Sequence, residues 1–323
     1  MPEISVIIPT RNRLTLLTRA LDSVLAQADV DLEVIVVDDG SSDGTWQMLT
    51  TLADPRVRAV HHAQSTGVSL ARNAGVEASS SSWIAFLDDD DFWAPHKLSV
   101  QLAALSSADA NMSFASAVMV DADERPGFVM RAPSTDRLLV RMVGTNCVGT
   151  PSSVIVSRAL FDESGGFDPA FSVLADWDLW LRMLDQGAIA APCPEPLIAY
   201  TRHANNMHLE STLQMVSEFN ALRVKHAALG QRFGVQFGNI EWSRWIASSH
   251  RRAGRRYRAA AAYFETGVRY RASRELARAA GVLLGERALR VGARLRPLHE
   301  NRHTEECSWL VHQSTSEADG ALR

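Results

Sequence analysis

The chain has 323 residues, of which 46% are hydrophobic and 22% charged. This composition is that of a globular protein with one large domain and an appendage, or with two domains. The formal net charge of −4 lacks the basic excess of a nucleic-acid-binding protein, so no nucleic-acid partner is expected. Three widely spaced cysteines favour a reducing cytoplasm. No signal peptide is expected, because the N-terminus has no basic segment before its short apolar run. No transmembrane helix is expected, because no apolar run approaches the ~18 residues of a span.

The basic residues are concentrated towards the C-terminal end of the sequence. Residues 241–300 contain 14 Arg, no Lys and 5 Glu, which gives them a net charge of +9. An acidic body with an Arg-rich extension indicates two parts with different roles. The pattern becomes helical from about residue 208, and residues 254–280 resemble a helical hairpin. The last ~20 residues are polar and aperiodic, which is typical of a loose tail.

The first hundred residues alternate short apolar runs with helical patterns. Continuous apolar strands separated by helices predict a mostly parallel sheet that helices cover on both faces. A proline is tolerated at the first helical position, so one helix is expected to start at Pro95. The predicted strands span 4–8, 32–37, 57–60 and 83–87, and the other predicted helices span 14–25, 43–52 and 68–78.

Residues 106–205 are less regular than the first hundred. Apolar runs predict strands over 112–120, 152–156 and 197–200, and a short helix is expected over 176–184. The stretch 121–150 is predicted to be a mobile loop region, because it contains Pro126, Gly127, Pro133 and Gly144.

Polar residues follow three of the predicted strands, at the sheet edge where α/β proteins bind ligands. Pro9-Thr10-Arg11 follows the first strand, Asp38-Asp39-Gly40 the second, and four carboxylates, Asp88–Asp91, the fourth. A solvated loop is the simplest interpretation of an acidic run, but this run lies at a strand end between large apolar residues. Converging carboxylates need a cation, and Mg²⁺ is typically bound by one or two carboxylates plus phosphates. The cluster therefore predicts a metal and a phosphate-bearing ligand.

Six segments, in order, resemble the motifs of family 2 glycosyltransferases with the GT-A fold. The resemblance implies a Rossmann-like, mostly parallel sheet and an inverting transfer of a sugar from a nucleotide-diphospho-sugar to a hydroxyl. It implies a GT-A domain over 1–205, with a nucleotide-binding half (1–105) and an acceptor half (106–205), before a helical Arg-rich extension (206–323). The segments are VIIPTRNR (6–13), VVDDGSSDGT (36–45), GVSLARNAG (67–75), FLDDDDFW (86–93), GGFDPAF (165–171) and LADWDLWLRML (174–184).

The resemblance implies a Mn²⁺ or Mg²⁺ site at the acidic run. Asp90 is the implied metal ligand, whereas Asp88 or Asp89 contacts the ribose or orders the loop. Asp91 is expected only to cap the segment after it. His203, at the end of the last strand, is a candidate to complete the metal site, with a structural role as the alternative.

The same resemblance implies a nucleotide pocket. Asp39 is expected to accept a hydrogen bond from the pyrimidine N–H, although Asp-Gly-Ser also favours a simple turn. Pro9, Thr10 and Arg11 are expected to line the pocket. Arg72 is expected to face the diphosphate or nucleotide, the alternative being a place on a surface helix. UDP is the preferred nucleotide, followed by dTDP.

Asp176 aligns with the catalytic base of the family. Many members have Glu-Asp at this point, and this chain has Ala175-Asp176. Asp178 is expected to act through helix-terminal electrostatics, because positions i and i+2 of a helix face different directions. Trp177 and Trp180 could stack on a sugar, with core packing as the alternative.

Three other classes of protein are conceivable for these motifs. Haloacid-type phosphatases need a DxDx[TV] sequence, and the residue two after Asp90 is Phe92. Sugar-nucleotide pyrophosphorylases need a glycine-rich segment with a lysine near the first strand, where this chain has PTRNR. A non-catalytic nucleotide-sugar-binding or scaffolding relative remains the alternative, and the presence of both Asp90 and Asp176 argues against it.

The resemblance leaves the acceptor open among glycans, lipid-linked precursors and small glycosides. A cytoplasmic enzyme is expected, with peripheral association at the inner face of a membrane as a hypothesis for the Arg-rich helices. Each basic residue near an anionic surface adds about 1 kcal/mol of attraction. The alternative is a solvated helical face whose Arg stems cover apolar surface.

Overall fold

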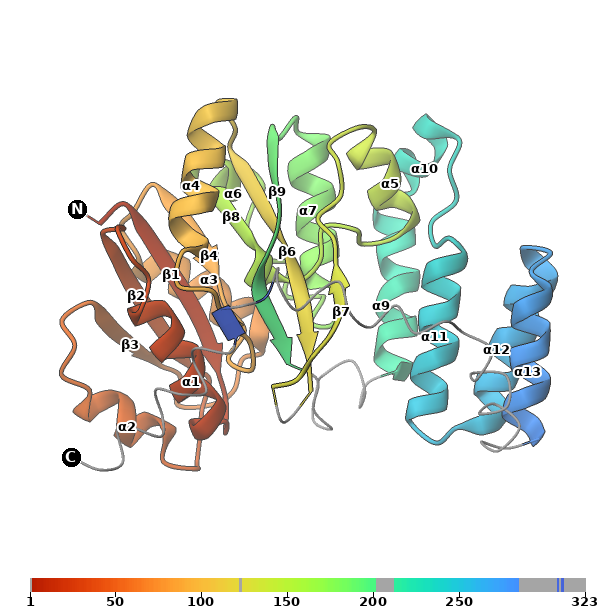
Figure 1. Ribbon diagram of the computed structural model, residues 1–323, viewed down its shortest axis with the longest axis horizontal. Coiled ribbons are helices and arrows are strands. Elements are labelled where there is room, and N and C mark those ends of the chain that lie inside the picture. Colours follow the sequence, from red (N-terminus) through yellow and green to blue (C-terminus); the bar gives the residue numbers. More distant parts are fainter. Residues whose placement is uncertain (1, 122–123, 202–211, 285–306, 308, 311–323) are drawn as a thin grey trace. The chain divides into compact units, whose positions relative to one another are not determined.

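The protein folds into two compact units. The computed structural model describes residues 2–121, 124–201, 212–284, 307 and 309–310 (Figure 1). The first unit comprises 1–138, 147–202 and 301–323, and the second comprises 139–146 and 203–300. The division therefore differs from the sequence-based one in two places, since residues 139–146 group with the second unit and the C-terminal residues group with the first.

A mixed nine-stranded sheet forms the first unit, in the order β3-β2-β1-β4-β8-β6-β9-β5, with β7 paired to β6. Strands β1, β2, β3 and β4 pair in parallel, and β6 and β9 continue in the same direction beyond the antiparallel strand β8. The strands are β1 (Ile4–Thr10), β2 (Leu32–Asp38), β3 (Val57–His61), β4 (Trp83–Phe86), β5 (Phe92–Trp93), β6 (Met112–Val120), β7 (Pro126–Met130), β8 (Val154–Ser157) and β9 (Ala190–Thr201).

Helices cover both faces of this sheet, which explains why β1 and β2 are mostly apolar and are buried along their whole length. Side chains of α1 and α4 pack with Ile4, Val6 and Ile8 on one face, and α3 packs against Ile7 on the other. The helices of this unit are α1 (Leu14–Leu25), α2 (Thr45–Thr51), α3 (Val68–Ala78), α4 (Lys97–Ala108), α6 (Arg158–Glu163) and α7 (Ala175–Asp185), with a 3₁₀ turn, η1 (Pro151–Ser153).

The segment 121–150, predicted to be a mobile loop, contains regular structure instead. It forms β7, which pairs with β6, and α5 (Leu138–Gly144). Proline and glycine at the start of β7 are tolerated because that strand pairs only with β6 and lies off the main path of the sheet. Helix α4 begins at Lys97 rather than at Pro95, and β9 is longer than the predicted 197–200 because it pairs with β6 along its length.

Part of the stretch expected to be a loose tail packs against the sheet of the first unit. Cys307, Trp309 and Leu310 are buried in the same apolar cluster as β5 and β9. The Trp309 indole N–H donates a hydrogen bond to the carbonyl of Pro196 at 3.0 Å, and its ring meets Phe92 edge-on. Apolar contact therefore fixes a segment whose neighbours in sequence are polar.

The second unit is helical. It contains α9 (Thr212–Lys225), α10 (Ala227–Phe233), α11 (Ile240–Arg252), α12 (Arg256–Arg269) and α13 (Ser273–Leu284). Helices α12 and α13 form the hairpin predicted over 254–280, and small residues bring them close together. None of the described helices is both long enough and apolar enough to span a bilayer. Helix α11 joins the core of the hairpin through Ala247, and the core residues of the hairpin itself are Ala259, Ala260, Tyr263, Ala279 and Val282.

Close packing of α3 on the sheet depends on Gly75, which gives a test of the fold. A Cβ at Gly75 would overlap the Ile7 side chain and lie 3.1 Å from Cγ2 of Val37. Gly75→Ala should therefore lower the free energy of unfolding by about 1–3 kcal/mol despite the better helix propensity of alanine. Urea denaturation measures this. The control Ser107→Ala, at an exposed position of α4, should be neutral or slightly stabilising, and equal effects of the two changes would contradict the packing.

Candidate active site

Of the four aspartates that follow β4, Asp88 is partly exposed, whereas Asp89, Asp90 and Asp91 are buried. The side chains of Asp88 and Asp90 are 25% and 11% exposed, whereas those of Asp89 and Asp91 are more deeply buried. Accessible carboxylates can meet a ligand, and the interior ones must find partners within the protein. Asp88 is therefore the member of the run that can most easily meet a ligand.

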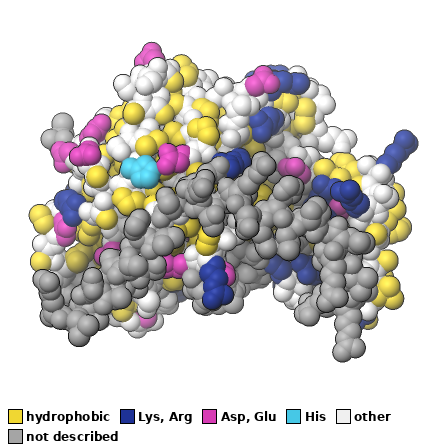
Figure 2. Space-filling view, viewed as in Figure 1, with side chains coloured by type: hydrophobic (Ala, Val, Ile, Leu, Met, Phe, Trp, Pro, Cys, Tyr) yellow, Lys and Arg dark blue, Asp and Glu magenta, His cyan; other side chains and the backbone are white. Residues whose placement is uncertain are grey.

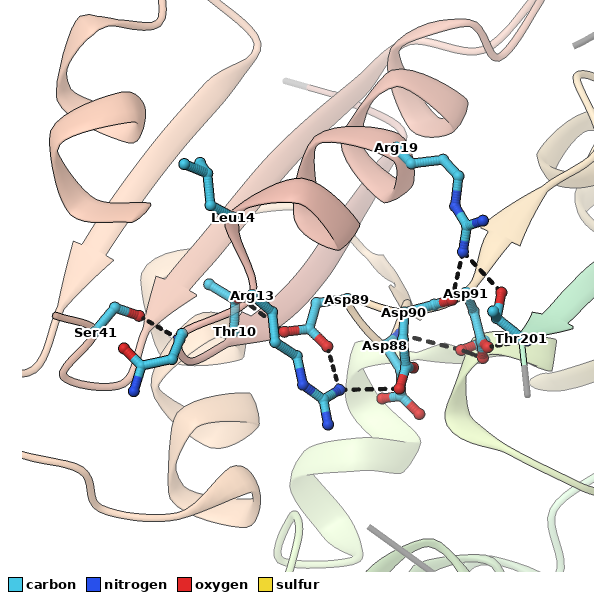
Figure 3. A network of polar contacts seen from close by, with 12 residues as sticks. Thr10, Arg13, Leu14, Arg19, Ser41, Asp88, Asp89, Asp90, Asp91 and Thr201 are labelled. Carbon is cyan, nitrogen blue, oxygen red and sulfur yellow. Dashed lines mark hydrogen bonds and ion pairs between the residues drawn. The ribbon is translucent and has the colours of Figure 1, made fainter. Parts of the chain in front are cut away.

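Arg13 neutralises the carboxylates of Asp89 and Asp90. Its Nη1 lies 2.9 Å from Oδ1 of Asp89 and 2.9 Å from Oδ2 of Asp90, as Figure 3 shows. The Thr10 hydroxyl donates to the other oxygen of Asp89 at 2.8 Å. Burial raises the pKa of Asp89 to about 6, although the charge of Arg13 opposes this rise. In this structure arginine supplies the cation that the acidic run requires.

Asp91 is a structural residue that connects three parts of the chain. It is fully buried, and it accepts hydrogen bonds from the Ser152 hydroxyl at 2.7 Å and the Thr201 backbone N–H at 3.1 Å. Arg19 completes the link by donating to the Asp90 carbonyl and to the Thr201 hydroxyl. Burial raises the pKa of Asp91 well above its usual range. The residue does more than cap the following segment, because it fixes the acidic loop to the end of β9.

Arg72 connects the acidic run to Asp176. It projects from α3, is buried, and donates to Oδ1 of Asp88 at 2.5 Å. Asp176 lies in the first turn of α7, where burial raises its pKa to about 7. The Trp177 N–H and the charge of Arg72 act against this rise, and the charge of Asp88 adds to it. Three separate sequence motifs therefore meet at one place, and the Arg72 side chain is buried although α3 has an exposed side.

Helix α3 also holds the loop that leads to α7. The Asn73 side-chain amide donates to the Phe167 carbonyl at 2.8 Å and accepts from the Phe167 N–H at 2.9 Å. The Ser69 hydroxyl donates to the Phe171 carbonyl at 2.6 Å. Because the loop is tied at both places, the start of α7 and hence Asp176 are fixed relative to α3.

Asp178 forms a buried ion pair rather than a purely helix-terminal contact. Its carboxylate is paired with Arg182 at 2.8 Å, one turn later in α7. Arg182 also donates to the carbonyls of Ser164 and Gly166, so the pair holds the Gly165-Gly166 turn. The tryptophans on either side of Asp178, Trp177 and Trp180, are both buried. This places them in the core rather than against a sugar.

Asp39 is engaged by the loop that precedes α3. Its carboxylate accepts hydrogen bonds from the N–H groups of Thr66 and Gly67 and from the Ser65 hydroxyl, and it contacts His62 Nδ1 at 2.8 Å. Burial by itself would raise the pKa of Asp39. The hydrogen bonds outweigh burial and hold this pKa well below its usual range. A pyrimidine N–H would have to share this carboxylate with the loop.

The other residues expected in the nucleotide pocket, Pro9, Thr10 and Arg11, differ in burial. Pro9 and Thr10 are buried at the end of β1, whereas Arg11 is exposed. The backbone of Asn12 has a φ of 54°, a left-handed turn that separates the direction of Arg11 from that of Arg13. His203 lies outside the described residues, so the structure does not place it.

Sequence reasoning missed Arg13, Arg19 and Tyr200 as parts of this site. Burial, followed by the charges of nearby aspartates including Asp91 and Asp176, raises the pKa of the Tyr200 phenol far above its usual range. The available signal was the position of each residue in the predicted elements. Arg13 directly precedes the predicted helix 14–25, Arg19 lies within it, and Tyr200 ends the predicted strand 197–200. That signal does not say which side chain points inward.

The arrangement combines the partly exposed carboxylate of Asp88, the arginines Arg13 and Arg72 that pair with the acidic run, and the carboxyl group of Asp176, whose pKa lies near neutrality. In the parts of the chain that are described, no group of three or more His, Cys, Asp or Glu side chains forms a cluster ready for a metal. Asp88 and Asp90 could hold a cation only together with ligand oxygens. A carboxyl group with a pKa of about 7 suits proton transfer at neutral pH.

Comparison with known proteins agrees with this chemistry. The Glycosyl transferase family 2 profile matches residues 5–165. The putative teichuronic acid biosynthesis glycosyltransferase TuaG of Bacillus subtilis is 30% identical over 64% of this chain and 81% of its own length. The UDP-Glc:α-D-GlcNAc-diphosphoundecaprenol β-1,3-glucosyltransferase WfgD of Escherichia coli is 28% identical over 58% and 72%. The succinoglycan biosynthesis protein ExoO of Rhizobium meliloti is 28% identical over 67% of this chain, which covers only 64% of that protein.

Solved structures share the fold. S. aureus TarS 1–349 in complex with UDP-GlcNAc superposes with a TM-score of 0.57, 16% identity and coverage of 82% of this chain and 80% of that one. The mannosyltransferase PcManGT of Pyrobaculum calidifontis, in complex with GDP-Man and Mn²⁺, gives a TM-score of 0.58, 19% identity, and coverage of 98% and 86%. The fold and site define a nucleotide-sugar glycosyltransferase with the GT-A fold, as the sequence predicted. The chain belongs to glycosyltransferase family 2.

The buried ion pair of Asp178 predicts a stability effect larger than a helix-terminal charge would give. Asp178→Asn removes the partner of Arg182, so the free energy of unfolding should fall by about 3 kcal/mol. A helix-terminal contact alone would cost about 0.3–1 kcal/mol. Urea denaturation distinguishes these values. The control Asp162→Asn, at an exposed position of α6, should stay within about 0.5 kcal/mol of the unchanged protein, and an equally small loss for Asp178→Asn would argue against a role for the pair in stability.

Proposed function

We propose that the protein is an inverting glycosyltransferase that moves a sugar from a nucleotide-diphospho-sugar, preferably a UDP-sugar, to an acceptor hydroxyl. Asp176 is the general base. The observation that carries this proposal is the link from Asp176 through Arg72 to Asp88, which joins a candidate base of pKa about 7 to the acidic run. The alternative, a non-catalytic nucleotide-sugar-binding relative, would bind the donor and hydrolyse none of it in the presence of Mn²⁺.

The donor set suits Mn²⁺ or Mg²⁺. Such ions take oxygen ligands and are usually held by one or two protein carboxylates plus substrate phosphates. Asp90 would hold the ion, with Asp88, the most exposed member of the run, beside it or on the ribose. Bound there, the ion supplies neutralisation of charge on the leaving diphosphate. His203 remains a candidate ligand from the sequence. The Mn²⁺ in the PcManGT complex supports this choice.

Arginines would bind and orient the diphosphate. Arg13 and Arg72 already lie against Asp88–Asp90, so an anionic ligand that enters beside them meets guanidinium groups at once. Bidentate geometry makes arginine well suited to phosphate oxygens. Arg13 would then exchange part of its contact with Asp90 for the ligand. Asp89 would remain bound to Thr10, which favours the loop-ordering role for Asp89 over contact with the ribose.

The nucleotide would lie at the ends of β1 and β2. Pro9, Thr10 and Arg11 would line its pocket, with the first two acting mainly through their backbone, since their side chains are buried. Asp39 would contact the base directly, by sharing its carboxylate between the base and the loop, or it would act indirectly by holding the loop that contacts the base. TarS was solved with UDP-GlcNAc and PcManGT with GDP-Man. UDP is preferred because WfgD is named for UDP-Glc.

Asp176 would remove the proton from the acceptor hydroxyl as that hydroxyl attacks the anomeric carbon. An inverting transfer has no covalent intermediate, so the proton must leave during the attack. A positioned carboxylate contributes about 10²–10⁴-fold to such a step. Arg72 would keep Asp176 in its ionised form near neutrality, because its charge lowers the pKa that burial raises.

The acceptor would be a glycan, a lipid-linked precursor or a small glycoside. WfgD is named for a diphosphoundecaprenol-linked acceptor, which favours the lipid-linked class. An enzyme with such an acceptor would work in the cytoplasm at the inner face of a membrane.

The metal proposal predicts the behaviour of Asp90→Ala. Transfer should become undetectable, and excess chelator should abolish transfer by the unchanged protein. Mn²⁺ together with UDP should raise the melting temperature of the unchanged protein and no longer raise that of the variant. Circular dichroism checks that the variant is folded, and Asp162→Ala serves as the control. Full activity in chelator would reject the metal.

The base proposal predicts both a rate and a pH profile. Asp176→Asn should lower kcat by about 10²–10⁴-fold while UDP affinity, measured by calorimetry, stays nearly unchanged. A base must be deprotonated to act, and burial raises the pKa of Asp176 to about 7. The kcat/KM of the unchanged protein should therefore fall as pH drops below about 7, and this inflection should disappear in the variant. A variant that keeps both its rate and the inflection would place the base elsewhere.

A further inference from the structure

Helix α12 of the second unit has a buried face and an exposed apolar stripe. The buried face contains Ala259, Ala260 and Tyr263 and packs in the core of the hairpin. Tyr257, Phe264 and Val268 are 72%, 59% and 58% exposed. These three residues are separated by seven and four positions, a spacing that places them on one side of a helix. Large apolar side chains gathered on one exposed face mark a surface that meets another body.

Two exposed leucines lie at the end of the partner helix, next to the start of α12. Arg256, at the start of α12, donates to the Leu283 carbonyl near the end of α13 at 2.8 Å. Leu283 and Leu284 are 45% and 78% exposed. We define the docking face as Tyr257, Phe264, Val268, Leu283 and Leu284.

The charges around the docking face are almost all positive. Glu265 is the one acidic residue within α12, and Glu275 of α13 is buried between Arg244 and Arg278. Figure 2 shows hydrophobic and Lys or Arg side chains next to one another over α12 and α13. The exposed arginines that flank the face are Arg251, Arg252, Arg256, Arg258, Arg269 and Arg271.

We propose that this face of the α12–α13 hairpin docks on an anionic lipid surface. Helices that lie in a bilayer interface combine an aromatic and aliphatic face with arginine or lysine beside it. The apolar residues would enter the boundary between headgroups and acyl chains, and the arginines would meet lipid phosphates. Two copies of the chain would bring segments of +9 charge together at this face, and their repulsion disfavours a dimer there. The surface thus selects an anionic partner.

This inference is independent of the catalytic residues, all of which belong to the first unit or to its sequence motifs. It deepens the proposal for a lipid-linked acceptor, because docking would hold the enzyme where that acceptor is. The two proposals depend on different residues. Docking can therefore fail while transfer to a soluble acceptor is retained, and transfer can fail while docking is retained.

Sedimentation of the full-length protein with vesicles tests the proposal. Vesicles of phosphatidylglycerol and phosphatidylcholine should pellet the protein at low salt, whereas vesicles of phosphatidylcholine alone should leave it in solution. High salt should release most of it, because screening removes the attraction of the arginines. Arg258→Gln should lower the partition coefficient about 5-fold, which corresponds to about 1 kcal/mol per basic residue. Phe264→Ser should lower it about 10-fold through lost apolar burial.

Phe128→Ser is the matched control, since Phe128 of β7 in the first unit is 66% exposed. It should bind vesicles as the unchanged protein does, and UDP affinity should be the same in all variants. Equal loss in Phe128→Ser and Phe264→Ser would overturn the proposal, as would equal pelleting by neutral and anionic vesicles. A concentration-dependent dimer in light scattering that Phe264→Ser dissociates would assign the face to a second copy instead and would also overturn it.

Discussion

Ion pairing between strand-end carboxylates and two arginines is the interaction on which the site depends. Four consecutive aspartates repel one another, and at low effective dielectric that repulsion is strong. Arg13 and Arg72 reduce it by pairing with Asp88, Asp89 and Asp90. A buried charge that loses its partner is costly, so the positions of β1, α3 and the acidic loop are coupled. The same arginines leave the site ready for an anionic ligand that arrives with a cation.

Helix α3 makes the second connection. It contributes Arg72 to the acidic run, Asn73 to Phe167 and Ser69 to Phe171. A single helix therefore sets the distance between the acidic run and the start of α7, where Asp176 lies. Because α3 packs closely on β1 at Gly75, the position of α3 is fixed relative to the sheet. Sites built on packed helices and strands hold their geometry better than sites built on loops.

The chain separates chemistry from surface attachment. All described residues of the candidate site belong to the first unit, and the second unit carries the arginines and the exposed apolar stripe of α12. The matched family profile ends at residue 165, before Asp176 and before the helices of the second unit that follow β9. Neither Asp90 nor Asp176 belongs to the second unit.

The sequence alone determined most strands and helices of residues 1–120, because continuous apolar runs and helical periodicity report burial directly. It also determined the family and the strand-end position of Asp39 and Asp88–Asp91. Tertiary structure decided which side chains meet. The turn at Asn12 points Arg13 rather than Arg11 towards the aspartates, and pairing with β6 made β7 from a stretch rich in proline and glycine. Burial, which no local pattern reports for a polar residue, turned Asp178 into an ion pair and raised the pKa of Asp176. Contacts between distant segments depend on the whole packing of the chain, and a short stretch of sequence does not contain that information.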